Sequence, residues 1–162
     1  MEANPEPTLA DDEERLAAFA EHLIEQVDTS IDGWVTRSVL AAASAGGVAV
    51  IEDDLAAVIQ QTRAAAMPEI RRVLRADVDT GAGSPLAALR NAVGPMTDHL
   101  DRWGAVRPPR DEFLERQFPG DPYQLGPAAF SDFDEDLHES GLVWGAARAH
   151  VHLRRRRESD CG

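Results

Sequence analysis

The chain has 162 residues, a length typical of one domain, and its hydrophobic content of 43% and charged content of 28% are ordinary for a globular protein. All 16 basic residues are arginine, so Schiff-base catalysis and a phosphate-binding loop with an essential lysine are excluded. The net charge of −13 disfavours general binding to nucleic acids, and the one cysteine, Cys161, leaves no partner for an internal disulfide.

The start of the chain predicts an arm followed by a long helix. Residues 1–10 contain two prolines and few apolar side chains, and we expect them to form a disordered acidic arm. From about residue 11, apolar side chains recur every three or four positions, which predicts an amphipathic helix to about residue 44, kinked near Thr29–Gly33. Gly46 and Gly47 are expected to end this helix.

Shorter helices are predicted next. Apolar periodicity continues over residues 52–74, and Pro68 predicts a kink or a break just before it, because proline lacks a backbone donor. Ser84 and Pro85 are typical of an N-cap and a first helical position. A further short helix is expected to end near Trp103.

Residues 104–135 have a different composition. Five prolines alternate with aromatic side chains, and one short helix is predicted over residues 110–118. Aromatic rings among prolines indicate an ordered wrap packed on a helical core. No segment shows the period-two alternation of a β-strand, so the sequence predicts an all-α, single-domain bundle of about five or six helices over residues 11–157. Residues 158–162 are expected to form a flexible tail.

The last predicted helix covers residues 137–157. Acidic residues precede it and Arg154–Arg157 end it, an arrangement that complements the helix dipole. Its middle carries apolar side chains on every side, which is typical of a helix buried at the centre of a bundle. These side chains are Leu142, Val143, Trp144, Ala146, Ala147, Ala149, Val151 and Leu153.

The segment SDFDEDLHES, residues 131–140, concentrates acids around one histidine. A calcium loop of the EF-hand type is excluded, because Leu137 and Val143 occupy positions that require Gly and Glu. Glu135 and His138 have the spacing of one ligand pair in helical metal sites, and Asp134 could complete a divalent-metal site. The favoured interpretation is a solvated acidic collar at the start of a buried helix, with no cofactor.

The cluster Arg154, Arg155, Arg156 and Arg157 has three interpretations. It can be the charged end of a helix, a docking patch for an acidic protein surface that includes the acidic arm of this chain, or a contact for nucleic acid or anionic lipid. The third is disfavoured by the overall negative charge.

Residues 110–157 also carry the pattern RDEF…FPGDPYQLGPAAF…LHESGLVWGAARAHVHLRRRR, which resembles the C-terminal part of a family of small proteins from high-GC actinobacteria. The resemblance implies a soluble cytosolic protein and transfers no catalytic residue.

The sequence favours a non-enzymatic interaction or regulatory protein that acts through its acidic surface and the arginine cluster. Its partner would be another protein or a second copy of the chain, and no membrane is expected because long uncharged apolar runs are lacking. A cytoplasmic location is expected, because the acidic N-terminus does not resemble a secretory signal. The alternative is a helical metalloprotein or metal-dependent enzyme that uses Asp134, Glu135 and His138.

Overall fold

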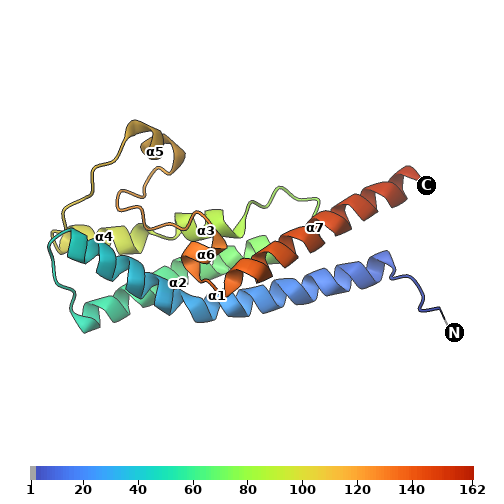
Figure 1. The fold of residues 1–162 in the computed structure, drawn as a ribbon, viewed down its shortest axis with the longest axis horizontal. Helices are drawn as coiled ribbons and strands as arrows, with labels where there is room; N and C mark the ends of the chain where they lie inside the picture. Colours follow the sequence, from blue (N-terminus) through green and yellow to red (C-terminus); the bar gives the residue numbers. More distant parts are fainter. Residues whose placement is uncertain (1–2) are drawn as a thin grey trace.

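The computed structural model describes residues 3–162, and over that range it contains helices and loops but no strand (Figure 1). The predicted all-α fold is confirmed. In chain order the helices are α1 (Leu9–Ala45), α2 (Glu52–Arg75), α3 (Pro85–Asn91), α4 (Gly94–Arg102), α5 (Glu112–Gln117), α6 (Phe130–Phe133) and α7 (Leu137–Asp160). Within the described residues, no helix is both long enough and apolar enough to cross a lipid bilayer.

Helix α1 extends through most of the molecule and supplies much of its core (Figure 1). Thr8 caps it: the Thr8 hydroxyl accepts a hydrogen bond from the Asp11 backbone N–H, and the Asp11 carboxylate accepts one from the Thr8 backbone N–H. The helix begins at Leu9, slightly before the predicted start, and it passes through the predicted kink at Thr29–Gly33 without a break. Its buried apolar residues recur at helical spacing: Ala20, Leu23, Ile24, Val27, Ile31, Trp34, Val35, Val39 and Ala43.

Helix α2 lies antiparallel to α1, as shown by the ion pairs that join them. Arg63 binds the carboxylates of Asp28 and Asp32 near the middle of α1, whereas Arg75, farther along α2, binds Glu21 nearer to the start of α1, with 2.7 Å between Nε and Oε1. The apolar face between the two helices holds the largest part of the core.

Pro68 does not interrupt α2, so the predicted break before this residue is wrong. Pro68 lies on the exposed face of the helix, and so does Ala64, whose carbonyl loses the hydrogen bond that proline cannot donate. On that face the carbonyl is open to solvent, so the missing bond costs little, and the helix continues to Arg75.

Helices α3 and α4 cover the other side of α2, and α4 also contacts the last turns of α1. Residues 103–136 then cross back over the bundle, with α5 standing away from it (Figure 1). Tyr123, Leu125 and Phe133 of this stretch are buried, while Phe113 of α5 is 71% exposed. The Pro-rich stretch therefore packs on the core through its second half.

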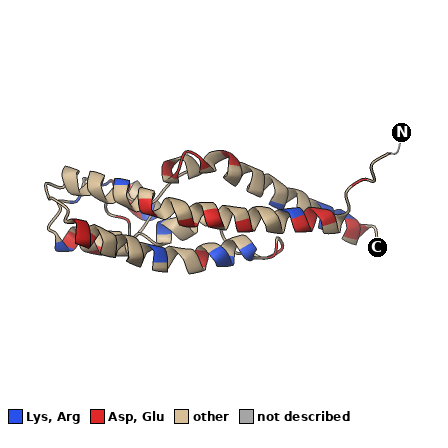
Figure 2. Cartoon of the chain, turned by 90° about the horizontal axis from the view of Figure 1, so that it is seen from below, with Lys and Arg blue, Asp and Glu red and all other residues tan. Residues whose placement is uncertain are grey.

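Helix α7 lies at the edge of the bundle, so the prediction of a buried central helix is wrong (Figure 2). It runs antiparallel along the first half of α1, with Asp134 close to Ser30 and Arg154 close to Asp12. Only Leu137, Gly141, Trp144 and Val151 are buried in it. Leu142, Val143 and Leu153 are 61%, 45% and 54% exposed.

The central position belongs to α1 because α1 packs against three helices: α2 from about Glu21 onward, α7 beside its first half and α4. Helix α7 packs on α1 and the short α6, and it binds the segment after α2 through Arg148 and Arg155. At Gly141 the packing is close, since a Cβ added there would lie 2.3 Å from a ring carbon of Phe130. The opposite side of α7 has no neighbour among residues 3–162, although its side chains are apolar.

Candidate functional site

The acidic segment predicted as a possible metal site is used for local structure. The Asp134 carboxylate accepts hydrogen bonds from the Ser30 hydroxyl at 2.6 Å and from the Asp136 backbone N–H at 3.0 Å. The bond from Ser30 is the main cause that lowers the pKa of Asp134 below its usual value. Glu135 and His138 are exposed to solvent.

The three predicted metal ligands are not brought together. Among residues 3–162, no group of three or more His, Cys, Asp or Glu side chains has an arrangement that could hold a metal ion. Asp134 is directed toward α1 through Ser30, whereas Glu135 and His138 are exposed. The metalloprotein alternative therefore has no donor set in the described part of the chain.

The arginine cluster is divided by the structure. Arg154 binds the Asp12 carboxylate and donates a hydrogen bond of 2.7 Å to the carbonyl of Pro7. Arg155 binds Glu13 at 2.8 Å and the carboxylates of Asp77 and Asp79. Arg156 and Arg157 are exposed and make no ion pair within residues 3–162.

Together Arg154, Arg155 and their four acidic partners form what we call the ionic clasp: Asp12 and Glu13 on α1, and Asp77 and Asp79 after α2. A hydrogen bond from Arg154 lowers the pKa of Asp12. The pKa of Asp77 is lowered most by a hydrogen bond from the Asp79 backbone N–H and next by one from Arg155. The clasp joins three segments of the chain, which is a structural role.

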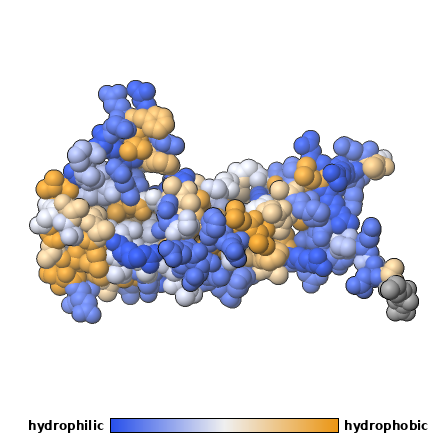
Figure 3. Space-filling model, in the orientation of Figure 1, coloured by the Kyte–Doolittle hydropathy of each residue, from blue (hydrophilic) through white to orange (hydrophobic). Residues whose placement is uncertain are grey.

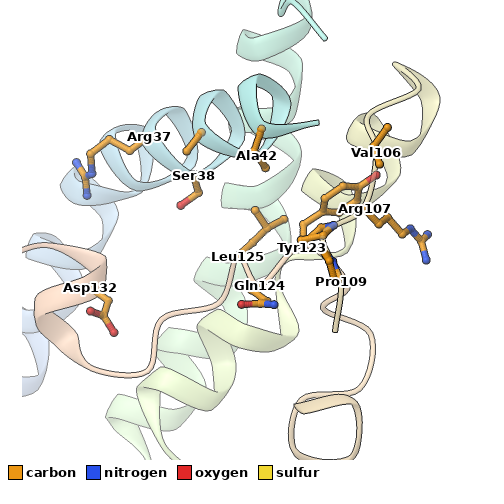
Figure 4. A pocket seen from close by; sticks show the side chains of 13 residues that line it. Arg37, Ser38, Ala42, Val106, Arg107, Pro109, Tyr123, Gln124, Leu125 and Asp132 are labelled. Atoms are coloured by element: carbon orange, nitrogen blue, oxygen red, sulfur yellow. The ribbon is translucent and has the colours of Figure 1, made fainter. Parts of the chain in front are cut away.

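A groove of about 780 Å³ lies between the end of α1 and the Pro-rich stretch (Figure 4). This volume is within the range of small-molecule and peptide sites, roughly 300–1,000 Å³. One wall is α1, and the other consists of residues 106–109 and 123–125. We call it the α1 groove.

Hydrogen bonds hold the second wall in place. The Tyr123 hydroxyl lies 2.7 Å from Asp101 Oδ1, and Arg107 binds the same carboxylate with Nε and Nη2 at 3.1 and 2.6 Å. These bonds lower the pKa of Asp101, the one from Arg107 most, and thereby keep the carboxylate charged. The Trp34 Nε1–H donates to the carbonyl of Leu125 at 3.3 Å, which fixes the wall to α1.

A tight turn sets the direction of Gln124. The buried Asp121 carboxylate accepts hydrogen bonds from the backbone N–H groups of Leu125 and Gly126 at 2.7 and 2.9 Å. Gln124 has a φ of 57°, the left-handed region that side chains other than glycine rarely adopt. Strain of this kind is often found at binding sites, and here it places the Gln124 amide at the groove (Figure 4).

A buried arginine supports the same stretch from behind. The Arg110 side chain is 5% exposed, and its guanidinium donates hydrogen bonds to the carbonyls of Leu114, Phe118 and Asp121. It therefore links α5 to the turn that carries Gln124. A charged group buried in this way makes the loop depend on a single side chain.

The α1 groove combines an apolar floor with a rim that carries two arginines, uncharged polar side chains and the carboxylate of Asp132. Ala41, Ala42 and Leu125 form the floor, and Arg37 and Arg107 stand at its two ends (Figure 4). Arg37 donates one hydrogen bond of 2.7 Å, to the carbonyl of Phe133. Within residues 3–162 the Ser38 hydroxyl and the Gln124 amide make no hydrogen bond, so both are available to a ligand.

Sequence patterns did not single out the groove residues. The aromatic and proline content of residues 104–135 indicated an ordered wrap, but nothing marked Ser38 or Arg37 on a helix of unremarkable amphipathic pattern. The same holds for the acids of the ionic clasp. One interpretation of the arginine cluster predicted docking on the acidic arm, residues 1–10. The acids that Arg154 and Arg155 bind at this end of the chain, Asp12 and Glu13, lie just beyond that arm on α1.

Comparison with protein-family models, with curated proteins and with solved structures gives no significant match for this chain. The resemblance of residues 110–157 to an actinobacterial family therefore remains a prediction. A helical bundle by itself implies no activity, because this architecture serves many unrelated functions.

Proposed function

We propose that this protein is a cytosolic, non-enzymatic interaction protein that binds an extended, carboxylate-bearing segment of a partner protein in the α1 groove. The observation that carries the proposal is the groove itself: an apolar floor with Arg37, which makes a single hydrogen bond, at one end, on a chain whose net charge is −13. Arg107 at the other end is paired with Asp101, so Arg37 is the guanidinium that would bind the carboxylate. Guanidinium groups favour carboxylates because their planar donors match the two oxygens.

The polar groups in the groove suit a peptide. The Gln124 amide offers both a donor and an acceptor, which is what the backbone of an extended peptide requires. Ser38 adds a hydroxyl on the opposite wall, beside Arg37. The floor of Ala41, Ala42 and Leu125 accommodates an apolar side chain of the same segment.

The acidic surface and the arginine cluster contribute less to this proposal than the sequence suggested. Two of the four arginines are engaged in the ionic clasp, so only Arg156 and Arg157 remain available to another molecule in the described structure. Two exposed arginines on an acidic protein give little attraction for nucleic acid.

A substitution in the groove tests the proposal. Ala41→Trp fills the groove from an exposed position of α1, and Ala65→Trp adds the same side chain to an exposed position of α2 outside it. Isotope-labelled protein is titrated with short extended peptides that carry either carboxylates or neutral amides, and binding is followed by NMR. We expect the acidic peptides to shift the Ser38 and Gln124 signals in wild type and in Ala65→Trp only.

The proposal is wrong if acidic and neutral peptides give the same response, or if Ala41→Trp binds as wild type does. A loss of binding in both tryptophan variants would also count against it, because Ala65 does not line the groove.

A further inference from the structure

Helix α7 has an exposed apolar face that nothing in residues 3–162 covers. Leu142, Ala146, Ala149 and Leu153 follow one another at steps of four, three and four residues, so they lie in one stripe. All four are exposed, and Val143 beside them is 45% exposed. Figure 3 shows an apolar patch near the start of this helix, with hydrophilic surface on either side of it.

The stripe can pack against the same stripe of a second copy when the two α7 helices run in opposite directions. With the two-fold axis between Ala146 and Ala149, Leu142 of one copy faces Leu153 of the other, and Ala146 faces Ala149. The alternating steps of three and four are those of a left-handed pair of packed helices. Gly145 has open space around it, and with the alanines it allows the two helix axes to approach closely.

The charges at the two ends follow the same register. Continuing the pairing outward places Glu139 opposite Arg156 of the other copy, and Asp136 two residues from the position that faces Arg157. All four side chains are exposed, and none makes an ion pair within residues 3–162. Figure 2 shows acids at the start of α7 and arginines toward its end.

A parallel pair of α7 helices would place Glu139 against Glu139 and Arg156 against Arg156. Like charges in direct opposition destabilise an interface, whereas the antiparallel pair brings opposite charges together at both ends. A sequence of acid, apolar and base along one face is complementary to itself under a two-fold rotation, which is the symmetry of most homodimers.

We infer that α7 is the interface of an antiparallel homodimer, in which the exposed stripe of one chain packs on that of a second copy. The occupant of the face is thus this chain itself. The inference does not depend on the proposed peptide site. The α1 groove lies near the end of α1, whereas α7 lies beside the first half of α1, and no residue that lines the groove belongs to α7.

The first test is the mass of the full chain in solution, measured by sedimentation equilibrium over a range of concentrations. We expect a monomer–dimer equilibrium that Leu142→Glu and Leu153→Glu each shift toward the monomer, raising the dissociation constant at least about tenfold. Phe113→Glu, at a residue of α5 that is 71% exposed, should leave the dimer unchanged. Circular dichroism confirms that each variant remains folded.

Charge reversal tests the register. Glu139→Arg and Arg156→Glu should each weaken the dimer about tenfold, and the double variant should recover most of the loss. Recovery is specific to the antiparallel pairing, because a parallel pair would juxtapose like charges in the double variant as in wild type. Failure to recover would contradict the proposed register.

Cross-linking tests the direction. In a Cys161→Ser background, a mixture of Leu142→Cys and Leu153→Cys chains should form a disulfide between the two variants. Leu142→Cys alone should not, because two copies of position 142 would lie about 16 Å apart. The proposal is overturned by a chain that remains monomeric, by a dimer that tolerates both glutamate substitutions, or by rapid cross-linking of Leu142→Cys alone. Binding of a different protein to this face with no self-association would also overturn it.

Discussion

Helices α1 and α7 are both long and rich in apolar residues, yet only α1 is buried along its length. Helix α1 has α2 on one side and either α7 or α4 on another, so a broad part of its surface is covered. Helix α7 has α1, α6 and the segment after α2 on one side, and its opposite apolar face remains exposed. The comparison shows that the number of neighbours, not the apolar content of a helix, decides whether it is central.

The largest difference between the two helices should appear on truncation of a large side chain. Trp34 on α1 is 2% exposed and packs on Phe133 with 5.2 Å between ring centroids. Trp34→Ala should lower the free energy of unfolding by about 3–5 kcal/mol, because it leaves a cavity in the core. Leu142→Ala on α7, measured in dilute solution by urea denaturation, should change it by less than about 0.5 kcal/mol. Equal losses would mean that α7 is as buried as α1.

Two glycines sharpen the comparison within α7. A Cβ at Gly141 would lie 2.3 Å from the Phe130 ring, so Gly141→Ala should destabilise the protein by about 1–3 kcal/mol through overpacking. Gly145 has no atom within 4 Å of the same point. Gly145→Ala should therefore stabilise it by about 0.5–1 kcal/mol through helix propensity. Thermal denaturation of both variants measures the difference, and the same sign in both would contradict the packing described.

The ionic clasp tests how α7 is held to the rest of the molecule. Arg155 contacts Glu13, Asp77 and Asp79, and its side chain is 26% exposed. Arg155→Met should lower the free energy of unfolding by about 1 kcal/mol at low salt and by less at high salt, since its partners are solvated and screened. Arg156→Met removes the same charge without a partner in residues 3–162 and should have no measurable effect in dilute solution, where the chain is monomeric. A loss independent of salt would contradict an electrostatic clasp.

The smallest expected effect is the pH dependence of the free energy of unfolding that arises from the buried His99. Burial, aided by Arg102, lowers the pKa of His99 below its usual 6.5, with Gln61 Oε1 3.0 Å from its Nε2. The unfolded chain therefore binds the proton more readily than the folded chain, so stability should fall as the pH decreases through 6.5 and level off below the folded-state pKa. Urea denaturation from neutral to mildly acidic pH measures this.

His99→Leu should flatten that profile, because it removes the imidazole that binds a proton when the chain unfolds. A slope that persists in His99→Leu would assign the dependence to another group. The carboxylates of Asp12, Asp77, Asp101 and Asp134, whose pKa values are lowered, act at lower pH: their contribution is complete above about 3.8 and is lost as the pH falls below it.

Parts of the candidate site could be predicted from local sequence and parts could not. The ordered Pro-rich wrap follows from its aromatic and proline content, and Tyr123 and Leu125 are indeed buried. The groove required Ser38 and Gln124 to meet, and their positions in the sequence give no reason for that. It also required the left-handed conformation at Gln124, which the buried Asp121 supports through two backbone hydrogen bonds.

The sequence by itself determined that the protein is helical, where most helices begin and end, and which face of α1 is buried, because these properties depend on spacing and caps within a few turns. Only the tertiary structure decided which long helix is central, how the last four arginines are used and where a groove forms. Those outcomes depend on contacts between distant segments. A helix with apolar side chains on every side can lie in the middle of a bundle, or at its edge with one apolar face exposed for binding to another molecule.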